Sequence, residues 1–515
     1  MAFSPAEHKK AQGDQARPTL LWLRRDLRLA DHPALASALY AGRPVIPVYI
    51  WDEVDAALLG AAPRWRLARS LEALAADIKA LGGRLILRKG AAEPTLRALI
   101  EETGAVAVHW SRYYEASAIN RDKAVKSALK SGGVEARSFE GFLLREPFET
   151  TTKTGGFFKV YTPFQKAFSA DYTPADALQR PSTWPAPSQW PESLDLSDLP
   201  LEAAMDRGAA VLARTVRAGE TAALERLSRF VGGPEVGDDL SGLAAYHDRR
   251  DRLDLSGTSG LSQHLTLGEI SPRRAWLAAS AAVEREPKAE AGAAVFLKEL
   301  IWREFAWHLA FHTPEIRSGN WRPEWDAFEW SDDPDAGGAP SPELSAWRQG
   351  RTGVAVVDAA MREIYVTGVM HNRARMIVGS YLTKNLLVHW RAGERWFADC
   401  LVDFDPASNA MGWQWVAGSG PDAAPFFRIF NPDTQAERFD PQGRYRARWL
   451  PERGEAGRSE ALALDAAPEV DGAAFFEACP RSWGLSPADP APLPSLDLKA
   501  GRERALAAYQ TLRRA

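Results

Sequence analysis

The chain of 515 residues contains only two cysteines, Cys400 and Cys479. Two thiols cannot hold an iron–sulfur cluster or form a cysteine-rich zinc site, and so few cysteines are typical of a reducing compartment. No apolar run is long enough to cross a membrane, and the polar residues 1–18 contain no apolar signal-peptide core. We therefore expect a cytoplasmic protein whose first 18 residues are disordered.

The chain also lacks an excess of positive charge, since its formal net charge is -4. Any contact with nucleic acid must then come from a local patch. One such patch is a basic strip from Arg362 to Arg395, with six basic and two acidic residues, although a solvated helix face gives the same pattern. The 19 tryptophans exceed ordinary usage. They fit stacking surfaces or electron-transfer routes, and also plain core packing.

Strand-like and helix-like segments alternate from Thr19 onwards, which predicts a doubly wound parallel sheet over residues 19–145. The expected strands are dense in Val, Ile and Leu and occupy residues 19–23, 43–51, 83–90, 105–110 and 134–144. The first strand runs into RRDLRLADHP, which has no glycine-rich turn to cradle a pyrophosphate. The pattern therefore argues against an ordinary dinucleotide-binding domain.

The second half of the chain is predicted to be all α-helical. Residues 146–200 are expected to form an interdomain linker, because much of this segment is rich in Pro and Ser and lacks periodicity. Helical periodicity follows and predicts a second domain over residues 201–515. Within it, residues 455–495 are rich in Ala, Pro and Asp and are expected to form a loose surface excursion.

Three hydroxyl residues, Thr258, Ser259 and Ser262, gather at the start of a predicted helix. Hydroxyls and free N–H groups at such a place favour an anion such as a diphosphate. Ordinary N-capping, which needs only one of these side chains, remains the alternative.

The helical segment from Val295 to His312 places Glu299, Trp302 and Arg303 on one face. An acid beside a tryptophan on an apolar helix suits hydrogen bonding to a buried polar ligand, and a surface Glu–Arg pair is the alternative. His308 and His312 have the spacing of zinc ligands, but no third ligand belongs to the pattern, so no metal site is predicted.

The segment 403–432 shows neither helical nor strand periodicity. Its small residues stand beside large aromatics and amides, which suggests backbone wrapped closely around a flat ligand. A buried connection between elements is the alternative.

Several of these stretches, taken in order, resemble the photolyase/cryptochrome family. They are LLWLRRDLRLADHPAL, GTSGLSQHLTLGEISP, ELIWREFAWHL, RTGVAVVDAAMRE, TGVMHNRARM, ASNAMGWQW and FRIFNPDTQAERFDPQGRY. The chain is most similar to bacterial cyclobutane-pyrimidine-dimer photolyases, and TGVMHNR with VAGSGPDAAP leans towards class III. The resemblance implies an α/β antenna-binding domain followed by a helical domain that holds FAD in a U shape and binds the DNA lesion.

The resemblance also implies which residues hold the cofactor. The FAD phosphates and ribityl chain would lie against Tyr246, Thr258, Ser259, Leu261 and Ser262. The flavin would be surrounded by Arg303, Asn372, Arg375, Asp403, Asp405 and Asn409. Within this set, Asp403 and Arg375 would form a buried salt bridge. Asn409 would face the flavin N5 atom, where plant cryptochromes carry an Asp.

The implied reaction is light-driven repair of ultraviolet-damaged DNA, in which reduced FAD donates an electron to a cyclobutane pyrimidine dimer and the ring opens. Glu299 would hydrogen-bond the carbonyl oxygens of the dimer, Trp302 and Trp415 would form its apolar walls, and Met376 would lie beneath it. Electrons would reach the flavin from the surface through the chain of tryptophans Trp330, Trp390 and Trp413.

The family further implies an antenna pigment. Tyr114 and Glu115 stand where folate-antenna members contact 5,10-methenyltetrahydrofolate, and 8-hydroxy-5-deazaflavin is the competing pigment. A signalling cryptochrome without repair activity and a (6-4) photolyase are the alternative functions. The lesion-facing residues favour repair, and Asn372, at a position where eukaryotic-type members have a His, argues against (6-4) lesions. We expect a monomer.

Overall fold

A computed structural model describes residues 17–202, 205, 207–232, 242–331, 339–422, 425–426, 428–453 and 470–514. Nearly all of the start that was predicted to be disordered, residues 1–18, lies outside the described residues, as do residues 455–469 of the predicted surface excursion. No helix among the described residues has the length and apolarity that crossing a membrane requires.

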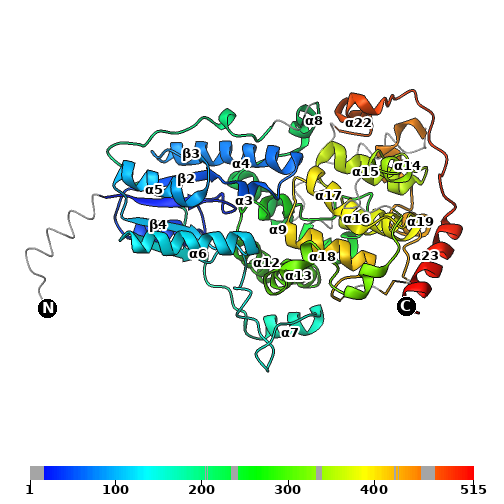
Figure 1. Cartoon of the computed structure of the whole chain (residues 1–515), viewed down its shortest axis with the longest axis horizontal. Helices are drawn as coiled ribbons and strands as arrows, with labels where there is room; N and C mark the ends of the chain where they lie inside the picture. The colour runs from blue at the N-terminus through cyan, green and yellow to red at the C-terminus, as the bar shows by residue number, and fades with distance from the viewer. Residues whose placement is uncertain are drawn as a thin grey trace, which may run out of the picture.

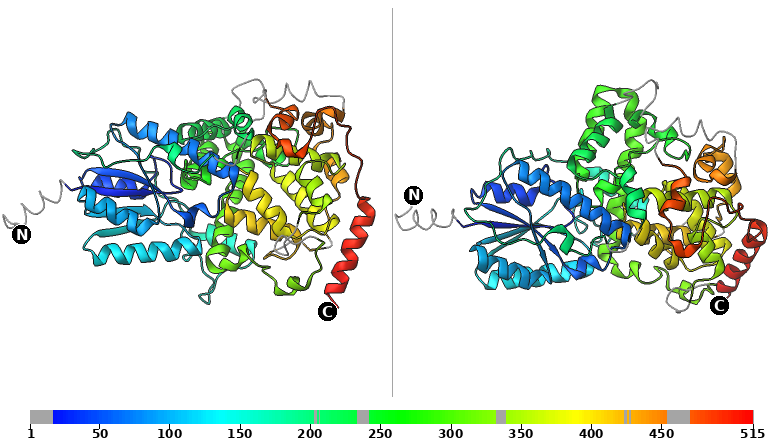
Figure 2. Two further views of the ribbon diagram at one scale, coloured as in Figure 1. Left: turned by 45° about the horizontal axis from the view of Figure 1, so that its top comes forward. Right: turned by 90° about the horizontal axis from the view of Figure 1, so that it is seen from above.

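The N-terminal part is a parallel sheet of five strands in the order β3-β2-β1-β4-β5. Its strands are β1 Thr19–Leu23, β2 Val45–Trp51, β3 Ile86–Lys89, β4 Ala107–Ser111 and β5 Glu135–Phe139. Helices cover both faces (Figures 1 and 2) and comprise α2 Pro33–Tyr40, α3 Glu53–Ala56, α4 Ala61–Ala80, α5 Ala92–Thr103 and α6 Ala116–Ser131. The predicted doubly wound fold class is confirmed.

Alternating side chains of β1 divide between the two layers, as the period of a strand requires. Leu21 and Leu23 pack with residues of α2 and α4, whereas Leu20 and Trp22 pack with residues of α5 and α6. Because both faces are buried, the strand reads in the sequence as a continuous apolar run.

The segment after β5 is more closely packed than a free linker. It contains α7 Tyr161–Asp171, which projects below the body of the molecule in Figure 1 and contacts the long helix α13. The chain then returns along the sheet, where the Trp184 Nε1 group donates a hydrogen bond to the Val45 carbonyl at 2.8 Å. The Leu194 N–H donates to the Leu87 carbonyl at 3.1 Å. Segment 172–200 therefore belongs to the packed surface of the sheet layer.

The remainder is helical, as predicted, and ends in α23 at the far edge of the molecule (Figure 1). The described helices are α8 Gly208–Thr215, α9 Glu220–Gly232, α10 Gly242–Arg249, α11 Ser262–Leu265, α12 Pro272–Arg285, α13 Glu290–His312, α14 Pro342–Arg348, α15 Ala355–Thr367, α16 Asn372–Ser380, α17 Trp390–Cys400, α18 Pro406–Ala417, α19 Pro432–Phe439, α20 Arg444–Trp449, α22 Ala473–Ala478 and α23 Leu498–Leu512. Short 3₁₀ turns and one π turn, Tyr381–Asn385, join some of them. Helix α22, with the buried Phe475, lies in the stretch expected to be a loose excursion.

Buried charges connect the sheet layer to the helical part. Arg66 of α4 pairs with Glu269 at 2.6 Å, and both side chains are fully buried. Burial alone would raise the pKa of Glu269, but Arg66 and His264 hold it at about 2. His264 lies in α11 and Glu269 follows that helix, so this cluster fixes α11 and the turn after it against the N-terminal part.

Candidate FAD and lesion site

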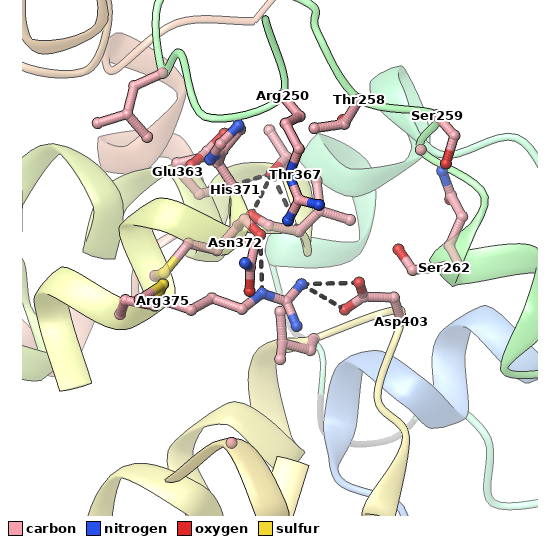
Figure 3. A pocket seen from close by; sticks show the side chains of 18 of the residues that line it. Arg250, Thr258, Ser259, Ser262, Glu363, Thr367, His371, Asn372, Arg375 and Asp403 are labelled. Atoms are coloured by element: carbon pink, nitrogen blue, oxygen red, sulfur yellow. Dashed lines mark hydrogen bonds and ion pairs between the residues drawn. The ribbon is translucent and has the colours of Figure 1, made fainter. Parts of the chain in front are cut away.

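A cavity of about 820 Å³ opens inside the helical part. It is bordered by residues of α10, α11, α13, α15, α16, α18 and α20, and Figure 3 shows part of its lining. Sixteen residues singled out from the sequence line it: Tyr246, Thr258, Ser259, Leu261, Ser262, Glu299, Trp302, Arg303, Asn372, Arg375, Met376, Asp403, Asp405, Asn409, Trp413 and Trp415. Segments far apart in the sequence are thus brought to one cavity.

The loop that enters α11 presents its hydroxyls to this cavity. No side chain caps the helix, because the N-cap position is Leu261. The capping alternative for Thr258, Ser259 and Ser262 is therefore not realised at this helix, and all three line the cavity. Gly260, with φ of +61°, allows the chain to pass Arg226, whose Nη1 atom would lie 2.3 Å from a Cβ at this position. Hydroxyls, N–H groups and a guanidinium here suit a phosphate-bearing ligand.

Arg375 and Asp403 form the ion pair that the family resemblance implies. One guanidinium nitrogen, Nη2, lies 3.0 and 2.8 Å from the two Asp403 oxygens, and Nε donates to the Met370 carbonyl at 2.8 Å (Figure 3). The Asp403 side chain is buried, whereas that of Arg375 is 29% exposed towards the cavity. The pair places a fixed dipole at the cavity wall.

Asn409 is held in a defined orientation on α18. Its Nδ2 amide donates to the Glu394 carbonyl at 3.0 Å and to the Glu394 carboxylate at 3.2 Å. With its amide hydrogens so used, Oδ1 is the atom that remains for the cavity. Asp405 begins the same helix: Oδ1 caps it by accepting from the Ser408 N–H, and Oδ2 accepts from the Trp307 indole.

The residues expected to face a DNA lesion lie in the same cavity. Glu299 and Trp302 come from α13, Met376 comes from α16 and Trp415 comes from α18. Glu299 forms an ion pair with Arg250, the residue that follows α10, and both side chains are only partly exposed. The side chains of Trp302 and Trp415 are half-buried, so each offers part of its ring to the cavity.

Sequence reasoning missed a number of lining residues, among them the titratable side chains of Arg226, Arg250, Glu363 and His371. Burial raises the pKa of Glu363 to about 7, although the Tyr445 hydroxyl donates to its carboxylate at 2.6 Å. Glu363 had been counted only as an acid in the basic strip, and Arg250 stands in a run of charges that reads as solvated. A better signal was available for Arg250, since it follows Tyr246 at helical spacing.

Comparison with known proteins identifies the family. The model described as "DNA photolyase" matches residues 19–187, and that described as "FAD binding domain of DNA photolyase" matches residues 296–511. The chain is 44% identical to the deoxyribodipyrimidine photo-lyase of Agrobacterium fabrum over 96% of this chain and 98% of that protein. This chain belongs to the photolyase/cryptochrome family.

Two further relatives are a photolyase of known structure and a plant cryptochrome. A crystal structure of a bacterial class III photolyase from Agrobacterium tumefaciens superimposes with a TM-score of 0.84 at 42% identity, covering 97% of this chain and 98% of that one. Cryptochrome-1 of Arabidopsis thaliana is 34% identical over 84% of this chain and 63% of its own length. Photolyases and a cryptochrome are thus both similar to this family member.

The cavity of this photolyase-family chain has the chemistry that FAD needs. The buried atoms Arg303 Nη2 and Trp413 Nε1 have no hydrogen-bond partner among the described residues, and both side chains line the cavity. Unpaired buried donors are costly, so a ligand with acceptors is expected to satisfy them. The dinucleotide supplies such acceptors in its phosphates, ribityl hydroxyls and flavin carbonyls.

The three tryptophans of the expected electron route differ in burial and in their contacts. Trp413 lines it, Trp390 is fully buried with its indole N–H donating to Asn320 Oδ1 at 2.9 Å, and Trp330 is half-buried. Trp330 and Trp390 both pack on His389, at ring separations of 5.1 and 5.6 Å. Of the three side chains, only that of Trp330 is partly exposed, and the electron route stays a prediction.

Tyr114 and Glu115 lie away from the cavity and are buried. The Tyr114 hydroxyl donates to the Glu146 carboxylate at 2.5 Å, and Glu115 pairs with Arg317 at 2.5 Å. Both contacts join the turn between β4 and α6 to later parts of the chain. These two side chains therefore have structural partners, whatever pigment the protein binds.

His308 and His312 of α13 hold the chain segment before α7. Ring nitrogens of both lie near the Pro147 carbonyl, at 3.0 and 3.3 Å, and His308 Nε2 accepts from the Phe158 N–H at 3.1 Å. Burial lowers the pKa of His308 to about 4, so its ring is neutral and carries its proton on Nδ1. The i, i+4 spacing that suggested metal ligands serves this packing.

Proposed function

We propose that the protein is a light-driven DNA repair enzyme that splits cyclobutane pyrimidine dimers in ultraviolet-damaged DNA. One observation carries the proposal: Glu299, Trp302, Met376 and Trp415 line the same cavity as the residues expected to hold FAD. A dimer turned out of the DNA into this space would meet the cofactor directly. Photolyases are among the enzymes known to turn a base out of the helix.

In this proposal one group of side chains binds the phosphate and ribityl part of FAD and a second group surrounds the flavin. Thr258, Ser259 and Ser262 would bind the phosphates and ribityl chain, with Tyr246 and Leu261 packed against them. The flavin would be surrounded by Arg303, Asn372, Arg375, Asp403, Asp405 and Asn409. When bound and reduced, FAD supplies an electron to the dimer on excitation by light.

The remaining residues would act on the lesion. Trp302 and Trp415 would exclude water and stack against the paired pyrimidines, and Met376 would fill the space beneath them. Glu299 would hydrogen-bond a carbonyl oxygen of the dimer and stabilise the negative charge that arrives there. A carbonyl only accepts hydrogen bonds, so Glu299 must exchange its partner Arg250 for the lesion and present a proton.

The test uses the purified protein with its FAD reduced and an oligonucleotide that contains one cyclobutane thymine dimer. Illumination is expected to restore the thymine absorbance, and samples kept in the dark should stay unchanged. Absence of recovery with FAD bound and reduced would refute the proposal. The same assay with a (6-4) lesion then separates the remaining repair activity from a cryptochrome that binds FAD without repair, the alternative to which the similarity with Cryptochrome-1 belongs.

We also propose an antenna pigment, 5,10-methenyltetrahydrofolate, with 8-hydroxy-5-deazaflavin as the competing pigment. The crevice where the strand order reverses, between β1 and β4, is the usual ligand position in such sheets. Near the carboxyl ends of β1 and β4, Trp22 and Trp110 pack in the core with ring centroids 5.9 Å apart, and the Arg24 guanidinium lies over the Trp22 ring. The pigment site that we propose is the region around Tyr114 and Glu115. Mass spectrometry of the released pigment distinguishes the two molecules.

The residue ranges of the parts also remain proposals: an antenna-binding domain over 19–145, a linker over 146–200 and an FAD- and lesion-binding domain over 201–515. We further propose a monomer in the cytoplasm. The free, buried thiols of Cys400 and Cys479 are consistent with a reducing compartment. Gel filtration of the purified protein tests the monomer.

A further inference from the structure

Tyr161, the first residue of α7, lies against the outer side of Trp302. The two rings are parallel within 5°, with their centroids 3.5 Å apart. Trp302 lines the cavity and Tyr161 does not. The tyrosine therefore covers the side of the indole that is turned away from the ligand, and leaves the side that faces the cavity uncovered.

A third ring completes the support behind the cavity wall. Phe305, one turn along α13 from Trp302, is fully buried and meets both rings edge-on, at 5.9 Å from Trp302 and 5.8 Å from Tyr161. Edge-to-face and parallel ring contacts restrict the rotation of the indole that they enclose.

Polar contacts tie Tyr161 to α13, which carries Glu299, and to the turn after α18, which carries Trp415. Its hydroxyl donates to the Lys298 carbonyl at 3.0 Å, directly before Glu299 on α13. Its backbone N–H donates to the Asp422 carboxylate at 3.2 Å, in the turn that follows α18 and Trp415. One residue of the segment between the two main parts thus contacts both walls of the cavity.

The chain before Tyr161 is itself anchored to α13. Phe157 stacks on His312 at 4.7 Å, with the rings parallel within 8°, and the Phe158 N–H donates to His308. These anchors fix the approach of the chain, so that Tyr161 reaches Trp302 from a constrained direction.

We propose that Tyr161 is a positioning residue for lesion binding: its ring and hydroxyl hold Trp302 in the orientation that stacks on a pyrimidine dimer. This inference rests on the proposed function. A fixed indole loses little rotational freedom when the dimer arrives, so the support acts on affinity for damaged DNA rather than on the electron transfer that follows.

The experiment compares four proteins with FAD bound: the wild type, Tyr161→Leu, Tyr161→Phe and Phe157→Leu. For each, Kd is measured for an oligonucleotide with one thymine dimer and for the undamaged oligonucleotide, and repair is measured at saturating protein. Loss of the ring in Tyr161→Leu is expected to weaken binding of the dimer by roughly three- to tenfold. Its affinity for undamaged DNA and its repair yield per bound dimer should be unchanged.

Tyr161→Phe keeps the stack and is expected to lie within about twofold of the wild type, which separates the ring from the hydroxyl. Phe157→Leu removes a stacked ring of the same segment far from Trp302 and controls for general loosening of that segment. If Tyr161→Leu loses FAD, Tyr161→Met, which fills similar volume without a ring, replaces it.

Equal discrimination between damaged and undamaged DNA in the wild type and the ring-less variant would overturn the inference. A loss of affinity for the dimer in Phe157→Leu that is as large as the loss in Tyr161→Leu would overturn it too, because loosening of the segment would then account for the effect. If the wild type itself neither binds nor repairs the dimer, the proposed function fails instead, so the two failures are distinguishable.

Discussion

The proposed role of Glu299 in repair can be tested without disturbing the rest of the cavity. In the free protein its carboxylate is held by Arg250, so both the removal of the acid and the removal of its charge can be tested. Glu299→Ala is expected to lower the repair yield by about tenfold or more, since one hydrogen bond to developing charge is lost in an enclosed site. Glu299→Gln keeps an N–H donor for the carbonyl and should retain more repair than Glu299→Ala.

The measurement is the yield of repaired dimer per absorbed photon, with FAD content read from the visible spectrum. Both variants should bind FAD normally. Equal repair by the wild type and Glu299→Ala would remove Glu299 from the mechanism.

Arg375 and Asp403 form an ion pair in which each charged side chain is stabilised by the other. Arg375→Leu leaves Asp403 buried without its counter-charge, and breaking a buried pair in this way costs about 3–5 kcal/mol. The double variant Arg375→Leu, Asp403→Leu should be less destabilised than Arg375→Leu alone. Melting temperatures of the apoproteins test this order, because they exclude the contribution of FAD binding. A single variant as stable as the double one would contradict it.

At the scale of the elements, α17 and α18 carry Trp390 and Trp413 of the proposed electron route. Trp413→Phe is expected to abolish most photoreduction of oxidised FAD, because the indole nearest the cavity is replaced by a ring that is harder to oxidise. Repair by protein that has been reduced chemically should persist. Trp449→Phe is the control, since Trp449 also lines the cavity but is not part of the proposed route. Undiminished photoreduction in Trp413→Phe would place the route elsewhere.

The contact between these two helices depends on a glycine. A Cβ at Gly393 would lie 2.1 Å from the Trp413 ring, so Gly393→Ala must displace the indole or the helix. We expect a loss of about 1–3 kcal/mol of stability, as in other overpacked cores, together with slower photoreduction. Gly232→Ala, at a helical glycine with open space around its Cβ position, is the matched control and should be neutral. Slow photoreduction in the control would show that the assay reports general destabilisation.

The sheet and most helices could be predicted from sequence because their patterns are local. The sheet strands are buried on both faces and read as apolar runs, and α4 to α6 lie between them as expected. Helix α18 gave no periodic signal because it is buried on several sides: Ala407, Ala410, Trp413 and Val416 pack in different directions. The tight pocket backbone inferred there proved to be a helix flanked by a turn at Gly418.

The gathering of the site could be anticipated through family resemblance, whereas several of its contacts could not. Arg226 approaches the loop before α11 closely because Gly260 has no side chain there, and Tyr161 reaches Trp302 from a different part of the chain. Neither contact produces a recognisable residue spacing in the sequence, because contacts between distant segments depend on how whole helices and strands pack together. For the same reason, the spacing of His308 and His312 on α13 did not reveal that they anchor the chain before α7.

At the scale of the whole molecule, Glu304 joins the two main parts. From α13 it accepts hydrogen bonds from the Leu144 N–H at 2.9 Å and the Arg145 N–H at 3.3 Å. Burial raises the pKa of its carboxyl to about 7, against the opposing effects of Arg303 and these N–H groups. The folded protein therefore binds a proton here more tightly than the unfolded chain does.

The sign of the pH dependence follows from linkage. For an acid whose pKa is raised on folding, its contribution to the free energy of unfolding is highest at low pH and falls as the pH rises from about 4.5 to about 7, by up to about 3 kcal/mol in total.

Glu304→Gln keeps an oxygen acceptor for the two N–H groups and cannot ionise. Relative to the wild type, its melting temperature should therefore rise between pH 5 and pH 8. Glu315→Gln, at an exposed acid of the same region, should show no such change. Parallel melting curves for the wild type and Glu304→Gln at both pH values would mean that Glu304 keeps its charge throughout, and that the two parts are joined by an ionised carboxylate.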